Sequence, residues 1–145
     1  MKRFFAVLFL LLVSLAAKNY DFLHYHHNFK KALNQAIKEE KMVMLFQVQD
    51  YCPWCSQMAQ TLIHPQIISE IKKNFIPILL NKNHDTIPEQ YRSPLIPAIY
   101  FINPFEDEEV WRNVGFRTFK ELLSSFKKAV KSFKEDLKEC EELDI

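Results

Sequence analysis

Glycine is almost absent from this sequence, which has 145 residues and a single glycine, Gly115. A dinucleotide-binding fingerprint or a phosphate-binding P-loop needs two or three glycines close together, where the backbone approaches phosphate. Both kinds of site are therefore excluded. The formal net charge is only +1, so nothing indicates a nucleic-acid surface and we expect no nucleic-acid partner. The length suits one domain with a hydrophobic core.

Long apolar runs are absent except at the amino terminus. Two basic residues precede the apolar residues 4–13, and Ser14 and Ala16 place small side chains at the two positions that a signal peptidase recognises. A membrane-spanning helix needs about 20 apolar residues, and this run is shorter. We therefore predict a signal peptide over 1–16, cleaved near Ala16, and a periplasmic or otherwise exported protein. An uncleaved amino-terminal membrane anchor is the alternative.

Cysteine is scarce, with three residues in the chain. Cys52 and Cys55 stand three positions apart in "DYCPWCSQM", residues 50–58, and the third is Cys140. In an oxidising compartment such a pair can cycle or persist as a disulfide. An odd number leaves at least one thiol unpaired or joined to another chain.

Features missing around this pair exclude haem attachment and disfavour two other kinds of site. Haem attachment needs a histidine directly after the second cysteine, where this chain has Ser56. A structural zinc site usually needs another CxxC or a spaced histidine pair, and there is no second CxxC. A static disulfide across three residues closes a tiny loop and stabilises little. Catalytic use of Cys52 and Cys55, without a metal or cofactor, is favoured.

Hydrophobic periodicity predicts an α/β domain around a mixed sheet. A helix capped by Asn28 precedes a mostly buried strand over 42–48, which runs straight into the CxxC. A helix then begins at Pro53 and breaks at His64, because a residue before proline disfavours helix. The later elements are strands over 75–81, 98–102 and "VWRNVGF", a loop with one helical turn after 81, and a long final helix.

The final helix carries an apolar stripe with alternating spacings of four and three residues. A continuous helix over 118–140 would be about 34 Å long, more than a domain of this size needs. Its second half either folds back over the aromatic segment 20–29 or pairs with a second chain, with Cys140 bridging a homodimer. The stripe consists of Phe119, Leu123, Phe126, Val130, Phe133, Leu137 and Cys140.

The position of Cys52 favours a nucleophilic role. At the start of a helix a cysteine meets the positive end of the helix dipole and unpaired N–H groups, which both favour the thiolate. Cys55 lies one turn further on, on the face expected to point to the core, where it would resolve the mixed disulfide. Tyr51 and Trp54 flank the cysteines and would form an apolar rim that holds an unfolded or peptide substrate.

The chain resembles the thioredoxin superfamily in "YCPWC" after a hydrophobic strand and in "IPAIYFI", whose Pro97 follows Cys52 by 45 residues. A closer similarity, over residues 28–126, is to the exported thioredoxin-like proteins of bacterial envelopes. It rests on "ALNQAIKEEKMVMLF", "CPWCSQM", "HPQIISEIKKNFIPI" and the sole glycine in "WRNVGF". The resemblance implies a central mixed sheet flanked by helices, in a domain over 28–145 that follows an extension over 17–27.

The resemblance also implies roles for single residues. Cys52 matches the attacking cysteine, Cys55 the resolving cysteine, and Pro97 the cis-proline, which leaves the backbone of Ile96 free to bond an extended substrate. The implied activity is exchange of disulfides with cysteine-containing envelope proteins. A membrane thiol-redox partner would restore the enzyme after each reaction.

The sequence departs from the family at several positions. Phe46 stands where many thioredoxins have a buried acid that helps deprotonate the second cysteine. Ser56 replaces a common lysine, and Ile96 replaces the usual threonine or valine. The Pro53-Trp54 dipeptide lacks the histidine that stabilises the thiolate in strong oxidants of this superfamily. We therefore favour a reductant.

Three histidines leave a second class of function open. His24, His26 and His27 form an H-x-H-H cluster, and imidazoles at such spacing can hold copper or zinc. If the cluster folds near Cys52 and Cys55, the chain is a non-enzymatic metal-binding module. Otherwise the cluster is surface or packs through its aromatic neighbours. A peptide-binding chaperone with incidental cysteines is a third, weaker hypothesis.

Overall fold

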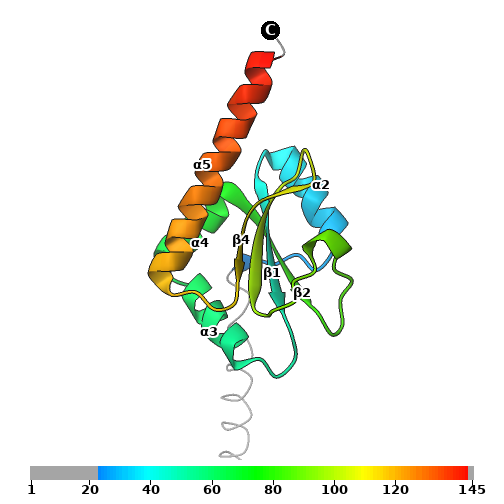
Figure 1. The fold of residues 1–145 in the computed structure, drawn as a ribbon, viewed down its shortest axis with the longest axis vertical. Coiled ribbons are helices and arrows are strands. Elements are labelled where there is room, and N and C mark those ends of the chain that lie inside the picture. Colours follow the sequence, from blue (N-terminus) through cyan, green and yellow to red (C-terminus); the bar gives the residue numbers. More distant parts are fainter. Residues whose placement is uncertain (1–22, 144–145) are drawn as a thin grey trace, which may run out of the picture.

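A computed structural model describes residues 23–143 (Figure 1). The predicted signal peptide and the first part of the predicted extension lie outside the described residues. The elements of the described chain are α2 (Phe29–Glu39), β1 (Met42–Val48), α3 (Pro53–Leu62), α4 (Pro65–Asn74), β2 (Phe75–Asn81), the 3-10 turn η2 (Glu89–Tyr91), β3 (Ala98–Asn103), β4 (Glu108–Val114) and α5 (Phe119–Leu143). Among the helices of residues 23–143, none has the length and apolar character needed to cross a membrane.

The described strands form one mixed sheet in the order β2-β1-β3-β4. β1 pairs parallel with β2, whereas β3 is antiparallel to both of its neighbours. The parallel pair needs a crossover, which α3 and α4 supply. In the β1–β3 register Gln47 lies opposite Ala98, so the end of β1 and the start of β3 meet at the same edge of the sheet. This confirms the predicted α/β fold with a central mixed sheet.

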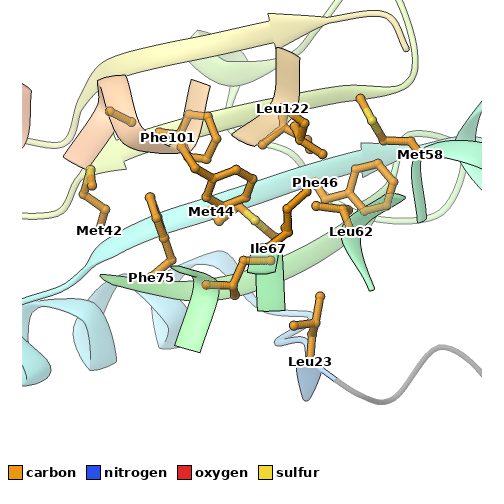
Figure 2. Packing of buried hydrophobic residues seen from close by; sticks show 14 of the residues in the cluster. Leu23, Met42, Met44, Phe46, Met58, Leu62, Ile67, Phe75, Phe101 and Leu122 are labelled. Carbon is orange, nitrogen blue, oxygen red and sulfur yellow. The ribbon is translucent and has the colours of Figure 1, made fainter. Parts of the chain in front are cut away.

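Helices cover both faces of the sheet, so β1 is buried along nearly its whole length. Successive side chains of a strand point to opposite faces. Met42, Met44 and Phe46 join the larger core cluster with residues of α3, α4 and α5 (Figure 2). Val43 and Leu45 join the second cluster, which includes residues of α2. This explains why "MVMLFQV" is a nearly continuous apolar run.

Local signals place the helix ends as predicted. The side chain of Asn28 caps α2 by accepting a hydrogen bond from the Lys31 N–H at 2.9 Å. The break before Pro65 is confirmed, since α3 ends at Leu62 and His64 is the N-cap of α4. The Nδ1 atom of His64 accepts from the Gln66 N–H at 3.4 Å.

The apolar stripe predicted for the final helix, which is α5, is confirmed in part. Phe126 and Phe133 are buried, but the centre of the buried face also includes Leu122 and Ala129, which the stripe left out. Phe119, Leu123, Val130 and Leu137 are partly buried at the margin. The ring of Phe133 stacks on Phe105, with 6.4 Å between centroids.

The end of α5 does not fold back over the described part of the aromatic segment. His26 in that segment lies beside Ile78 of β2, and the end of α5 runs past the sheet (Figure 1). That alternative is therefore wrong for residues 23–29. The homodimer through Cys140 stays a prediction, because its side chain lies outside the described part of the structure.

Candidate active site

The cysteine pair lies where β1 passes into α3. Cys52 is the N-cap of α3 and Pro53 is its first residue, a position that does not need the missing N–H. Cys52 and Cys55 are joined by a disulfide, with 5.2 Å between their Cα atoms. Cys52 is partly exposed, while Cys55 is 6% exposed. One sulfur therefore faces solvent and the other faces the core.

The backbone around Cys52 favours negative charge on its sulfur. The Cys55 N–H donates a hydrogen bond to the Cys52 Sγ at 3.1 Å. The first turn of α3 has no acidic residue, so no carboxylate there opposes the helix dipole. After reduction, this donor and the helix dipole would stabilise the Cys52 thiolate, which is the nucleophile in disulfide exchange.

An apolar groove of about 660 Å³ opens beside the disulfide. It is lined by Tyr25, Phe46, Val48, Gln49, Tyr51, Cys52, Pro53, Cys55, Ser56, Ala59 and Leu79. Phe46, at the position of the family's buried acid, is 2% exposed, and its ring lies 6.5 Å from that of Tyr25. Burial raises the pKa of the Tyr25 phenol above its ordinary 10.0. Among the described residues that line the groove there is no carboxylate.

Both aromatic residues beside the cysteines are exposed, and their role as a substrate rim stays a prediction. Tyr51 is 102% exposed and has a left-handed backbone, with φ 52°. Trp54 is 56% exposed, and its ring centroid lies 5.5 Å from that of Phe116. The two rings therefore extend the apolar surface of the groove on the outside of the molecule.

Ile96 and Pro97 lie at the same edge of the sheet as the cysteine loop. The Ile96–Pro97 peptide bond is cis. Pro97 directly precedes Ala98, which lies opposite Gln47 of β1. The carbonyl of Pro97 accepts a hydrogen bond from the Gly115 N–H at 2.7 Å. Gly115 has φ +83°, a conformation that other residues rarely adopt. This accounts for the single glycine of the sequence.

The histidine cluster lies along β2. The His26 N–H donates to the Pro77 carbonyl at 2.9 Å, and the His27 Nδ1 lies 3.1 Å from the Leu79 carbonyl oxygen. Tyr25, directly before His26, reaches the groove, a role that the sequence analysis missed. In residues 23–143 no group of three or more histidine, cysteine or acidic side chains could hold a metal ion.

A polar network ties the cysteine loop to the loop after β2. Asp50, two residues before Cys52, accepts from the Asn81 Nδ2 at 2.9 Å, and its Oδ2 lies 2.7 Å from the His84 Nε2. The Asp50 N–H donates to the Asn83 Oδ1 at 2.9 Å. No pattern in the sequence marks His84 as a partner of Asp50. The Asn81 hydrogen bond, followed by His84, lowers the pKa of the Asp50 carboxyl below its ordinary value.

We predict that Asp50→Asn destabilises the protein at pH 6 and has little effect at pH 3. The folded-state pKa of Asp50 is depressed, so its contribution is present above the unfolded value of 3.8 and is lost as pH falls through the folded pKa. The carboxyl is exposed, so the fall in Tm should be no more than a few degrees. Thermal unfolding of both proteins at the two pH values checks this, with Asp136→Asn as control. An equal difference at both pH values would contradict the prediction.

The comparisons agree with this geometry. The sequence model of a family described as thioredoxin-like matches residues 23–104. A thioredoxin from Thermus thermophilus is 26% identical, with a TM-score of 0.62 over 72% of this chain and 85% of that one. The Neisseria meningitidis DsbD C-terminal domain in its oxidised form (20% identical, TM-score 0.57, covering 69% of this chain and 91% of that one) shares the fold. A DsbH oxidoreductase also shares the fold (20% identical, TM-score 0.56, covering 74% of this chain and 83% of that one). No curated protein sequence matches the chain.

Proposed function

This chain belongs to the thioredoxin-like family and is a thiol–disulfide oxidoreductase, and we propose that it reduces disulfides of exported proteins. The position of Cys52 is the observation that carries the proposal. Its sulfur is partly exposed at the N-cap of α3 and accepts the Cys55 N–H, while Cys55 is buried behind it. This asymmetry suits an attacking and a resolving cysteine.

The reaction begins with the reduced pair. The Cys52 thiolate attacks one sulfur of a substrate disulfide, a mixed disulfide forms, and the other substrate sulfur leaves as a thiolate that takes a proton from solvent. Cys55 then loses its proton and attacks the Cys52 sulfur. The Cys52–Cys55 disulfide forms as the mixed disulfide breaks, and the second substrate thiolate leaves. Two electrons pass to the substrate.

Proton removal from Cys55 proceeds through water in this mechanism. The described residues that line the groove include no carboxylate, because Phe46 takes the place of the family's buried acid. Water can reach the groove wall beside Ser56, which is exposed. The resolving step is therefore expected to be slower than in relatives that retain the acid.

Protein cysteines, rather than small thiols, are the proposed substrates. Tyr51, Trp54 and the groove offer an apolar surface to side chains that flank a cysteine in an unfolded chain. Ile96 lies at the same edge of the sheet, where its backbone would pair with an extended segment. A compact thiol such as glutathione would contact little of this surface.

The direction and location of the reaction are part of the proposal. Pro53-Trp54 offers no cation to stabilise the reduced form, which supports a reductant. Signal peptide 1–16 would export the chain, and a membrane thiol-redox partner would supply two electrons to the oxidised pair. The structural similarity to the DsbD C-terminal domain and to a DsbH oxidoreductase supports a thiol-redox partner.

We expect the reduced Cys140→Ser protein to reduce an unfolded disulfide-bonded protein at least about tenfold faster than it reduces oxidised glutathione. Rapid acid quenching followed by thiol labelling measures both rates, and Cys140→Ser removes the third thiol from the count. Equal rates would contradict the assignment of protein substrates. If the protein instead oxidised the reduced substrate under the same conditions, the proposed direction of electron transfer would be wrong.

A further inference from the structure

The outward face of α5 carries a row of lysines that the redox function does not use. We call Lys120, Lys127, Lys131, Lys134 and Lys138 the α5 lysine face. All five are exposed. Their spacings of seven, four, three and four residues align them on one side of the helix. Leu122, Phe126 and Ala129, which pack on the sheet, occupy the opposite side.

Neighbouring side chains extend this positive surface. Two shallow grooves of about 430 and 400 Å³ run along α5. They add Lys128 and Lys73 to the face, and the carboxylate that they contain is Glu70. Glu135 pairs with Lys131 at 3.8 Å at the margin. Positive charge is therefore in clear excess on this face, although α5 as a whole carries six lysines and six acidic residues.

The lysine row does not result from a basic composition. The whole chain has 19 basic and 18 acidic residues. Glu106, Asp107, Glu108 and Glu109 lie together in the β3–β4 turn and the start of β4, and none of them lines the grooves of the α5 lysine face. The lysines and this acidic cluster therefore occupy different positions on a nearly neutral chain, which matters for association rather than for fold.

We propose that the α5 lysine face binds the anionic surface of a lipid bilayer. From Lys120 to Lys134 the row is about 21 Å long and straight, because it follows one helix. A cluster of 4–8 lysines is the pattern that anionic lipid headgroups attract, with each lysine contributing separately. A flat charged surface can meet all of these side chains at once.

The side chains around the row favour lipid over an acidic protein. Protein interfaces have a buried apolar core with aromatic anchors. Among the described residues, the exposed large hydrophobic side chains lie off this face, and Trp111, 40% exposed, borders it. The Lys128 Nζ lies 5.2 Å from the centre of the Trp111 ring. A tryptophan beside lysines suits the headgroup region of a bilayer.

Membrane binding would complement the proposed reduction without depending on it. The face lies on α5, whereas the cysteines lie at the start of α3 (Figure 1). Neither Tyr51 nor Trp54 belongs to the lysine face or its grooves. The active site would therefore stay open to substrates while the protein is held near a membrane electron donor.

The test compares two variants of the full chain that change charge equally. The first combines Lys120→Gln, Lys127→Gln, Lys131→Gln and Lys134→Gln. The matched control combines Lys30→Gln, Lys31→Gln, Lys38→Gln and Lys72→Gln, which are equally exposed but lie on α2 and α4. The measurement is the partition of each protein onto phosphatidylcholine vesicles with and without about one third phosphatidylglycerol.

We expect phosphatidylglycerol to raise partition of the unchanged chain and of the control, and about 0.5 M salt to abolish the gain. The α5 variant should lose at least about tenfold of that gain. The apolar run 4–13 contributes equally to all three proteins and does not respond to lipid charge. An equal loss in both variants would overturn the proposal, since net charge alone would then explain binding. No gain with phosphatidylglycerol, or binding only to an acidic protein, would also overturn it.

Discussion

The Cys55→Ser protein is expected to accumulate covalent complexes with its substrates, whereas Cys52→Ser should form almost none. Cys52 presents its sulfur to solvent at the N-cap of α3, and Cys55 is 6% exposed. Without Cys55 the enzyme has no second active-site thiol to break the mixed disulfide, so the mixed disulfide persists. Without Cys52 the nucleophile itself is missing. Turnover should fall at least about a thousandfold in both variants.

Non-reducing electrophoresis of both variants, incubated in reduced form with an unfolded disulfide-bonded protein, checks this prediction. Both proteins carry Cys140→Ser, which removes complexes formed through the third thiol, and the Cys140→Ser protein alone is the control. The complexes should disappear when a reductant is added. If Cys52→Ser trapped substrate as well as Cys55→Ser does, the assignment of the attacking cysteine would be wrong.

The largest effect on stability is expected from Phe126→Ala. Phe126 is fully buried, and its ring lies 5.2 Å from that of Phe75 and 4.9 Å from that of Phe101, edge-on to both. Its removal would leave a cavity between α5 and the sheet. Such truncations lower the free energy of unfolding by about 3–5 kcal/mol. For a domain of this size that is a fall in Tm of about 10–20 °C.

Denaturant and thermal unfolding measure this loss, with Phe105→Ala as the matched control. Phe105 is 47% exposed and stacks on Phe133. The same chemical change should therefore lower the free energy of unfolding by less than about 1.5 kcal/mol there. Similar losses in the two variants would mean that α5 does not pack on the sheet through Phe126.

Local chemistry made much of the fold predictable. The apolar run of β1, the cap at Asn28 and the break before Pro65 each depend on neighbouring residues, and all three are confirmed. The CxxC, in which Pro53 starts a helix directly after the first cysteine, likewise predicted where Cys52 and Cys55 lie. Each of these signals acts within a few residues along the chain.

Features that depend on distant parts of the chain were not predictable in the same way. Asp50 and His84 meet because β1 and β2 are parallel neighbours, so the loops after them lie at the same edge. Tyr25 reaches the groove because its segment lies beside β2. The buried face of α5 includes Leu122 and Ala129 because the position of the sheet, rather than the apolar stripe alone, selects it.

Phe46 shows how one substitution changes the chemistry without changing the fold. The residue is 2% exposed in the core behind the cysteines and lines the groove with them. A carboxylate there would have to be desolvated, whereas phenylalanine is stabilised by burial. The groove is therefore more apolar, and in the proposed mechanism the resolving cysteine depends on water to lose its proton.

The reduction potential of the Cys52–Cys55 pair, measured in glutathione buffers with the Cys140→Ser protein, tests the central claim most directly. The account predicts a reversible two-electron couple near the value of about −270 mV found for thioredoxin. A couple near about −120 mV would contradict the assignment as a reductant and indicate an oxidant. If the pair shows no reversible couple at all, the assignment of a redox-active centre is wrong.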